Sequence, residues 1–333
     1  MDFPVKEKAV PPLIPMSADD RDLLQEAWDT TRAHHGSDLT FYLPGMIRYG
    51  RVRGRYPAVS LTGTWCALQC DHCRGKLLEP MIPVSGPSDL LKKASRLRDR
   101  GAHGLLLSGG ADKDGRLPWQ AYAEAITRIG LETGLFLSAH TGFPHTEDCR
   151  LLRASGVQQG LIDVMGDRDT ATGVYHLPGL DSVVRSMDAI LESGLSFVPH
   201  IVAGLHYGNL RGEHRALQLL ASRRPSALVF VVLTGLPGTP MESIRPPSPV
   251  EVARLIAEAR ILMPDVPLSL GCERPRNREG AMLESLALCA GITRMAVWSE
   301  EAVEQARAWG LHPRFQATCC SLPFQPDFSC DGP

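Results

Sequence analysis

The sequence predicts an α/β fold of the TIM-barrel type, with eight strand–helix units, a helical extension before them and a tail after them. From Tyr56 onward, short β-branched or apolar runs alternate with amphipathic helical stretches. Eight runs follow one another at start-to-start spacings of 25 to 46 residues. The chain has 333 residues, of which 44% are hydrophobic, so it has room for one barrel plus extensions. A partial barrel of six plus two units and a doubly wound open sheet are the alternatives.

Each unit of the barrel is defined by a short apolar run and the helical stretch that follows it. The expected strands are 57–62, 103–108, 135–139, 160–165, 195–202, 227–233, 266–270 and 293–298. The expected helices lie near 88–100, 118–133, 146–155, 180–193, 210–223, 249–262, 279–290 and 300–309. We therefore place the barrel at residues 56–310.

The segments outside the barrel have patterns of their own. Ser17 followed by Asp20 forms a helix N-cap, and an apolar stripe continues this helix to about His35. An aromatic and glycine-rich connector, FYLPGMIRYGRVRGRYP, then leads into the barrel. We expect an N-terminal arm and helix at 1–55 and a C-terminal tail with a cysteine pair at 311–333.

Composition excludes several classes of function. Lys and Arg number 35 against 37 Asp and Glu, and the basic residues are scattered, so a nucleic-acid partner is not expected. No run of about 18 apolar residues is present, so no membrane span is expected. The N-terminus lacks the continuous apolar core of a signal peptide, which indicates a soluble cytoplasmic protein.

Nine cysteines are many for a reducing compartment, and metal binding or catalysis is the leading interpretation. Cys66, Cys70 and Cys73 form a C-x3-C-x2-C pattern directly after the first expected strand. Three thiolates on one loop can hold three irons of a 4Fe–4S cube and leave the fourth iron open. The amino and carboxylate groups of S-adenosylmethionine could chelate that open iron. A zinc knuckle is the alternative, although structural zinc sites use four protein ligands.

This cysteine pattern resembles that of the radical S-adenosylmethionine superfamily, in which it follows the first barrel strand. The resemblance implies a 4Fe–4S cluster on Cys66, Cys70 and Cys73. His72 stands where the superfamily usually has an aromatic residue before the last cysteine.

The resemblance also implies positions that bind S-adenosylmethionine. A glycine-rich turn after the second strand binds the methionine end in the superfamily, and LLLSGGAD supplies Ser108, Gly109 and Gly110 here. The chain has Ala111 where an acidic residue is often found, with Asp112 next.

Later strand ends carry further cofactor-binding candidates. Superfamily members use such positions for ribose and adenine contacts, which makes His140, Asp163 and Gly204 candidates here. The alternatives are that a strand-end aspartate, such as Asp163 or Asp167, caps the next helix and that His200 is a core histidine.

A second set of three cysteines lies in the C-terminal half: Cys272 after the seventh strand, and Cys319 and Cys320 in the tail. Thiolates in this number predict an auxiliary iron–sulfur cluster. Arg274 and Arg276 would lie nearby and bind a substrate carboxylate or offset cluster charge. Alternatively, the vicinal pair is incidental and the arginines pair with Glu273 or Glu279. Cys149 and Cys289 are interpreted as buried apolar residues, and Cys330 is left open.

Segments across the barrel resemble one subgroup, the archaeal and bacterial two-component lipoyl synthases: CDHCRGKLLEPM, SGGADKDGRLP, LSAHTG, VMGD and GCERPR. The resemblance implies sulfur insertion into an octanoyl chain on a carrier protein, together with a second radical protein. A ferredoxin or flavodoxin would supply electrons. The alternatives are another radical reaction, such as methylthiolation, peptide modification or cofactor maturation, and an iron–sulfur or zinc scaffold without activity.

Overall fold

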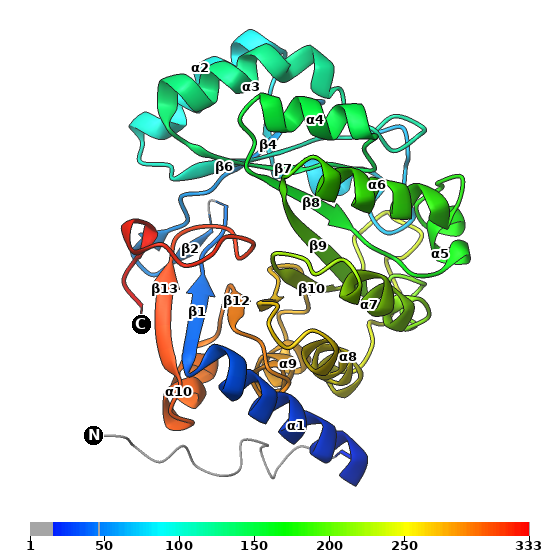
Figure 1. Ribbon diagram of the computed structural model, residues 1–333, viewed down its shortest axis with the longest axis vertical. Helices are drawn as coiled ribbons and strands as arrows, with labels where there is room; N and C mark the ends of the chain where they lie inside the picture. Colours follow the sequence, from blue (N-terminus) through cyan, green and yellow to red (C-terminus); the bar gives the residue numbers. More distant parts are fainter. Residues whose placement is uncertain (1–15, 46, 333) are drawn as a thin grey trace.

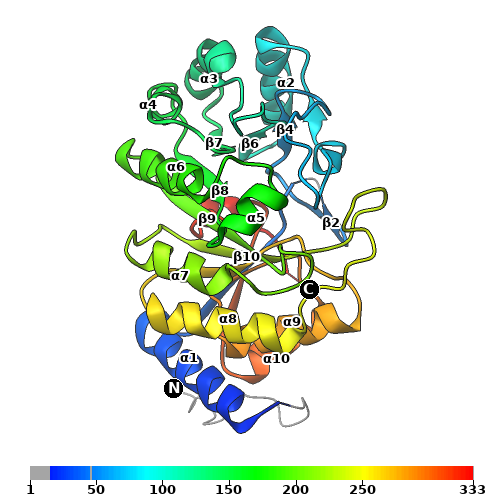
Figure 2. The same cartoon turned by 90° about the vertical axis from the view of Figure 1, so that its right-hand side faces the viewer.

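A parallel sheet of eleven strands curls through the molecule, and the helices pack around its outer side (Figures 1 and 2). The computed structural model describes residues 16–45 and 47–332. In spatial order the strands are β13 (His312–Gln316), β1 (Asp38–Tyr42), β12 (Arg294–Ala296), β11 (Leu268–Leu270), β10 (Leu228–Val232), β9 (Ser196–Ala203), β8 (Gln159–Asp163), β7 (Phe136–His140), β6 (Gly104–Ser108), β4 (Ala58–Ser60) and β5 (Ile82–Pro83). A separate antiparallel hairpin joins β2 (Arg48–Tyr49) to β3 (Val52–Arg53).

The fold is the α/β barrel type that the sequence predicts. All eight expected strands are present, as β4, β6 to β12, and each pairs in parallel with its neighbour in the sheet. Within the described residues no ladder joins β5 to β13, so the curled sheet is a partial barrel with a seam between its two edges. Parallel strands point the same way, so the loops that follow them gather at one end of the barrel.

Three strands of the main sheet, β1, β5 and β13, have no counterpart in the sequence prediction. β1 comes from the start of the connector and lies between β12 and β13. β13 comes from the tail and forms the edge of the sheet. Its sequence, HPRFQ, contains a proline and charged side chains, which are typical of an edge strand and give little strand signal.

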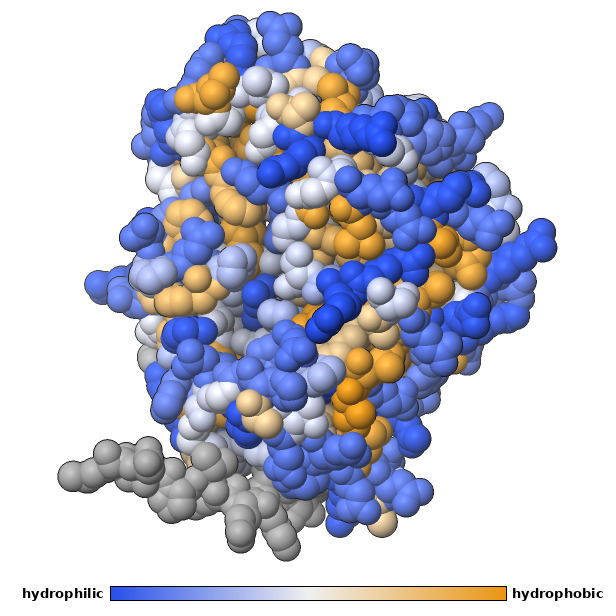
Figure 3. Space-filling model, viewed as in Figure 1, coloured by the Kyte–Doolittle hydropathy of each residue, from blue (hydrophilic) through white to orange (hydrophobic). Residues whose placement is uncertain are grey.

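Ten α-helices occur in the described part of the chain: α1 (Ala18–His35), α2 (Pro87–Asp99), α3 (Trp119–Thr133), α4 (Thr146–Ala154), α5 (Arg168–Gly173), α6 (Leu180–Glu192), α7 (Glu213–Ala221), α8 (Pro249–Leu262), α9 (Arg278–Cys289) and α10 (Glu300–Ala308). Two 3-10 helices are also present, η1 (Lys76–Leu78) and η2 (Pro326–Phe328). None of these helices has the length and apolar composition needed to cross a bilayer. Figure 3 shows a largely hydrophilic surface on one face, with separate hydrophobic patches.

Helix caps follow the sequence signals closely. The Ser17 hydroxyl accepts a bond of 3.1 Å from the Asp20 amide at the start of α1. Ser248 and Glu251 form a reciprocal capping box on α8. The short helix α5 has no counterpart in the prediction. Asp167 caps it by accepting from the Thr170 amide, as the capping interpretation of a strand-end aspartate expects.

The tail turns into the barrel after β13, and we call residues 317–322 the tail plug. Its backbone carbonyls are bonded by side chains from three strands: Leu322 by the Tyr42 hydroxyl at 2.7 Å, and Ser321 by Gln159 at 3.1 Å and Arg294 at 3.0 Å. Cys320 packs within the barrel against apolar side chains that include Leu161, Val198 and Val229. These contacts fix the tail plug inside the barrel.

Candidate active site

A cavity of about 380 Å³ opens at the carboxyl ends of the strands. Its lining comes from the loop after β4, the turn after β6, the ends of β7 to β10, and the residues after β11. The tail plug adds Cys319 and Cys320. Both sets of cysteines that the sequence singles out therefore face one space.

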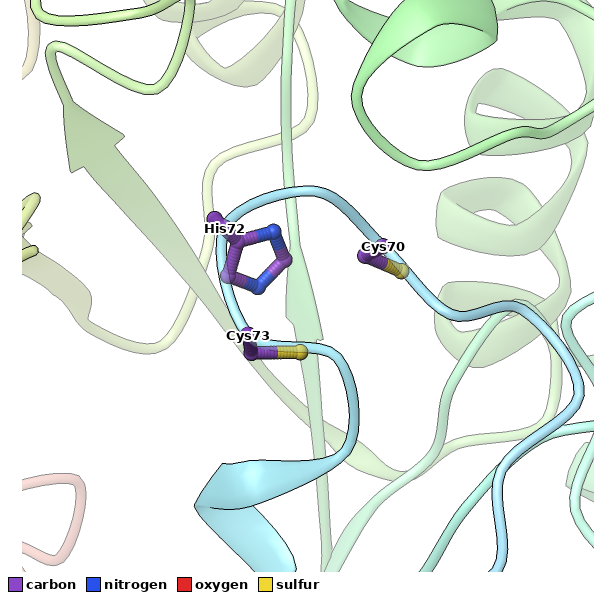
Figure 4. A group of neighbouring side chains, drawn as sticks. All are labelled: Cys70, His72 and Cys73. Carbon is purple, nitrogen blue, oxygen red and sulfur yellow. The ribbon is translucent and has the colours of Figure 1, made fainter. Parts of the chain in front are cut away.

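The loop after β4 presents the first set, and we call residues 63–75 the cysteine loop. The amides of Cys73 and Arg74 both donate to the Cys70 carbonyl, at 3.1 and 2.8 Å. Gln69 and Arg74 adopt positive φ angles of 46°. The resulting tight turn places the ligand atoms of Cys70, His72 and Cys73 within 4.8 Å of one another (Figure 4).

The chemistry of these thiols fits an iron–sulfur cluster. A hydrogen bond from Cys70, aided by His72, lowers the pKa of Cys73 to about 4, and the same pairing raises the pKa of Cys70. Iron binds thiolates, so a site with one thiol already ionised and two more beside the same cavity suits it. Cys66 lines the cavity from the same loop.

Gly110 lets the cysteine loop pack on the turn after β6. A Cβ atom at this position would overlap the carbonyl oxygen of Trp65. The Gly110 amide also donates to the Thr62 hydroxyl at 2.6 Å. Ser108 and Gly109 line the cavity beside it. The glycine pair expected to approach a ligand thus has a demonstrable role in holding the cysteine loop.

Two contacts of the cysteine loop have no counterpart in the sequence analysis. Asp71 accepts bonds from Arg74 at 2.7 Å and from the Tyr207 hydroxyl at 2.6 Å, which joins the loop to the segment after β9. The His72 ring lies 4.9 Å from the ring of Tyr175, so this departure from the superfamily pattern keeps a ring-to-ring contact. Neither long-range pair leaves a spacing signal in the sequence.

His140, Asp163 and His200 come together at the ends of β7, β8 and β9. Their ligand atoms lie within 4.8 Å of one another, and the Tyr175 hydroxyl donates to Asp163 at 2.6 Å. Burial opposes ionisation of Asp163, but His140 and its other partners outweigh it and lower the pKa of that carboxyl. Burial of the His140 ring acts to lower its pKa, but the charge of Asp163 and the hydrogen bond to it outweigh burial and raise that pKa. Asp163 and His140 thus form an ion pair at the cavity wall.

His200 is the neutral member of this group. Burial, followed by the His140 charge, lowers its pKa to about 4. Its Nδ1 atom has no hydrogen-bond partner among the described residues, and the side chain lines the cavity. The interpretation as a core histidine with satisfied bonds therefore does not describe it.

Cys272, Cys319 and Cys320, the expected auxiliary set, all line this cavity. Burial raises the pKa of Cys272 to about 11. Hydrogen bonds from Cys320 and Ser321 lower the pKa of Cys319 to about 6 and leave the Cys320 thiol with a raised pKa. Cys319 thus resembles Cys73, because in each case a hydrogen bond from a neighbouring cysteine lowers the pKa of the thiol.

Arg274 and Arg276 brace this wall and are not part of the cavity lining. The guanidinium of Arg274 is fully buried and donates to Glu284 at 2.6 Å and to the Ala296 carbonyl at 2.8 Å. Its acidic partner is therefore Glu284 and neither of the two glutamates nearer in sequence. Arg276 donates to the Cys272 carbonyl. Both contacts hold the segment that carries Cys272.

The remaining candidates lie outside the cavity. Gly204 has a positive φ of 79°, its amide donates to Glu213 at 2.8 Å, and a Cβ there would overlap Pro247. Cys149 and Cys289 are fully buried among apolar side chains, as expected. Cys330 is partly exposed.

Comparison with known proteins gives relatives of one general kind. No family model matches the sequence. The biotin synthase of Alkalilimnicola ehrlichii is 28% identical over 285 residues, which cover 81% of this chain and 78% of that protein. The 7,8-didemethyl-8-hydroxy-5-deazariboflavin synthase of Methanothermobacter thermautotrophicus is 24% identical over 62% of this chain and 69% of its own.

Solved structures show the same fold. Methylornithine synthase matches 90% of each chain with a TM-score of 0.62 at 15% identity. The hydrogenase maturase HydG matches 90% of this chain and 70% of its own with a TM-score of 0.64 at 13% identity. The solved structures thus share the fold of this chain. The cysteine loop and the similarity to biotin synthases support its assignment to the radical S-adenosylmethionine superfamily.

Proposed function

We propose that this chain is a radical enzyme that inserts sulfur into an octanoyl chain held on a carrier protein, as a component of a lipoyl synthase. Cys66, Cys70 and Cys73 would hold a 4Fe–4S cluster. When bound, that cluster supplies the electron that splits S-adenosylmethionine into methionine and a 5′-deoxyadenosyl radical. The protein's own residues position the reactants and keep water away.

One observation carries the proposal: two sets of three cysteines line the same cavity. Between them the wall is largely apolar, with Leu106, Leu161, Val202, Val229 and Val231. Such a wall suits an aliphatic chain and protects a radical from side reactions. A cavity that only held an electron-transfer cluster would not need a second set of thiols or an apolar wall of this extent.

Residues around the cysteine loop are proposed to bind S-adenosylmethionine. Ser108, Gly109 and Gly110 offer backbone groups next to the loop, where the methionine end would lie. The Asp163 carboxylate and His140, paired at 3.5 Å, offer an acceptor and a donor for the ribose. Gly204 shapes the turn after β9, and this turn would lie on the side of the adenine ring of S-adenosylmethionine.

Cys272, Cys319 and Cys320 are proposed to hold the auxiliary cluster as a sulfur source. These residues would hold sulfide beside the octanoyl chain. The 5′-deoxyadenosyl radical would take a hydrogen atom from a C–H bond and leave a carbon radical, and bonding of that carbon to sulfide would release one electron, which a ferric iron of the auxiliary cluster would accept. Arg276 would hold the segment that carries Cys272 through its bond to the Cys272 carbonyl, and Arg274 would hold the same segment through its ion pair with Glu284. The proposed partners are a ferredoxin or flavodoxin, a second radical protein and the octanoylated carrier.

The test measures iron, sulfide and products on anaerobic protein with an octanoylated carrier, with and without a biotin-synthase-like partner. Alanine at Cys66, Cys70 or Cys73 should abolish 5′-deoxyadenosine formation. Alanine at Cys272, Cys319 or Cys320 should leave that cleavage and stop the sulfurated product. Cys149→Ala is the matched control because its thiol is buried away from the cavity.

Other outcomes point to the alternative functions. If cleavage occurs without any sulfurated product and the auxiliary iron survives turnover, the lipoyl synthase proposal fails and another radical modification replaces it. A colourless, zinc-containing protein that does not cleave S-adenosylmethionine would indicate a scaffold.

A further inference from the structure

A second cavity, of about 590 Å³, lies at the seam of the barrel and shares no lining residue with the first. Its walls are the β2–β3 hairpin, the end of α2 and the last residues of the chain. The C-terminal segment, red in Figure 1, lies beside β2. Four arginines contribute to the lining, Arg51, Arg53, Arg55 and Arg100, and we call this cavity the arginine pocket.

Acidic side chains among the described residues offset the positive charge of the arginine pocket only in part. None of its four arginines forms an ion pair with any residue in the described part of the chain, whereas Arg98 and Arg314 nearby are paired with aspartates. Asp331 is the one acidic residue in the lining. Burial raises the pKa of Cys330 to about 11, so its thiol adds no negative charge near neutral pH. The carbonyl end of α2 offers a weak partner to Arg100 alone.

The hairpin adds to this imbalance. In the β2–β3 register, Arg48 lies directly opposite Arg53. Like charges at such positions destabilise a strand pair. A local arrangement that opposes stability without a compensating contact is typical of a functional site.

We propose that the arginine pocket binds a small molecule that carries a diphosphate group. Guanidinium groups bind phosphate oxygens through two parallel hydrogen bonds, and four arginines line this one cavity. The four arginines carry more positive charge than the Asp331 carboxylate can offset, and this excess suits a multiply charged anion. The pocket is enclosed by three separate segments, which favours a compact ligand over a flat protein surface.

The bound anion would also act on the tail. Ser329 to Asp331 form one wall of the pocket. The Cys330 amide donates at 3.0 Å to the carbonyl of Phe315, which belongs to β13. The same segment continues from the tail plug, so the anion would reinforce the part of the chain that holds Cys319 and Cys320. This inference goes beyond the proposed function and does not depend on it.

The experiment is calorimetric titration of the full chain with sodium pyrophosphate at constant ionic strength. We expect saturable binding, with slower amide exchange in residues 48–55 and 328–332. The double variant Arg53→Gln/Arg55→Gln should bind at least about tenfold more weakly, since two charged hydrogen-bond donors to the anion are lost. Arg215→Gln, which changes an exposed arginine of α7, should bind as the unaltered chain does.

Thermal stability separates a binding role from a structural one. Without anion, Arg53→Gln should keep or raise the melting temperature because the repulsion with Arg48 is removed. Pyrophosphate should then stabilise the unaltered chain but not the double variant. Equal or non-saturable binding by both proteins overturns the inference. Tighter binding of a poly-aspartate peptide than of pyrophosphate also overturns it, and assigns the patch to an acidic protein partner.

Discussion

The cysteine loop and the tail plug bring the same chemistry to one cavity by different routes. Cys66, Cys70 and Cys73 lie on one loop whose backbone bonds close the turn locally. Cys319 and Cys320 meet Cys272, which lies 47 residues before the first of them, because side chains from three strands bind the plug. The cysteine loop also bonds to distant segments, but its three cysteines lie within eight residues of one another. The second set instead needs β1, β8 and β12 in place to bring its cysteines together. Substitutions that weaken one set of cysteines should therefore affect that set more than the other.

The largest effect is expected at the wall that carries Cys272. Arg274→Met leaves Glu284 buried without its charged partner and should lower the free energy of unfolding by about 3–5 kcal/mol. Arg254→Met removes an exposed pair with Asp20 and should cost less than about 1 kcal/mol. Denaturant unfolding measures both. If Arg274→Met is as mild as its control, the wall does not depend on this pair.

Gly110→Ala tests the other side of the comparison. The new methyl group would force the cysteine loop away from the turn after β6, at a cost of about 3 kcal/mol, and iron bound by the loop should fall. Gly130→Ala is the control because it meets no atom within 4 Å, and it should stabilise α3 by about 0.5–1 kcal/mol. Iron analysis and unfolding curves together check the result. Normal iron content in Gly110→Ala would show that the loop forms without this contact.

A smaller effect is expected from loosening the tail plug alone. Tyr42→Phe leaves the buried Leu322 carbonyl without its donor and should lower the free energy of unfolding by about 1–2 kcal/mol. Alkylation of Cys320 should become faster, while Cys70 reacts at its original rate. Tyr49→Phe, which removes a bond to exposed Glu300, serves as the control. Equal acceleration at both cysteines would mean that the two sets are not independent.

The smallest effect is a pH dependence that touches neither set. Burial, and then Arg260, lower the pKa of His35 to about 4 from its usual 6.5. The unfolded chain therefore binds the proton first, and stability is full above about pH 6.5 and falls as the pH drops towards 4. His35 is partly exposed, so the discounted loss is about 1–2 kcal/mol. His35→Gln should flatten this part of a stability–pH curve, and an unchanged slope would contradict the assignment.

The sequence predicts the parts of the fold that depend on local patterns. Eight strands each carry an apolar run that the barrel buries, and all eight are present. β1 was missed because its apolar residues run directly into the turn residues Pro44 and Gly45, and β13 because an edge strand with a proline has little apolar signal. The cysteine loop follows from spacing alone.

The tail plug shows why the rest of the site could not be predicted in detail. Three thiols indicated a second set, but its anchors are backbone carbonyls, which every residue has. Arg274 was expected to bind a substrate carboxylate or offset cluster charge, with a nearby glutamate as the alternative partner. Its partner is Glu284, which the fold of α9 brings close. The Asp71–Tyr207 and His72–Tyr175 contacts are likewise products of the tertiary fold.

The position of the tail plug also sets an order in time. During synthesis Cys66, Cys70 and Cys73 leave the ribosome early, before most of the barrel exists. Cys319 follows Cys73 by 246 residues, and the strands that receive the tail plug must already be in place when it binds. A newly made chain thus passes through a stage in which one set of thiols is complete and the other is not. The two sets of thiols are therefore completed one after the other, the cysteine loop before the set that needs the tail plug.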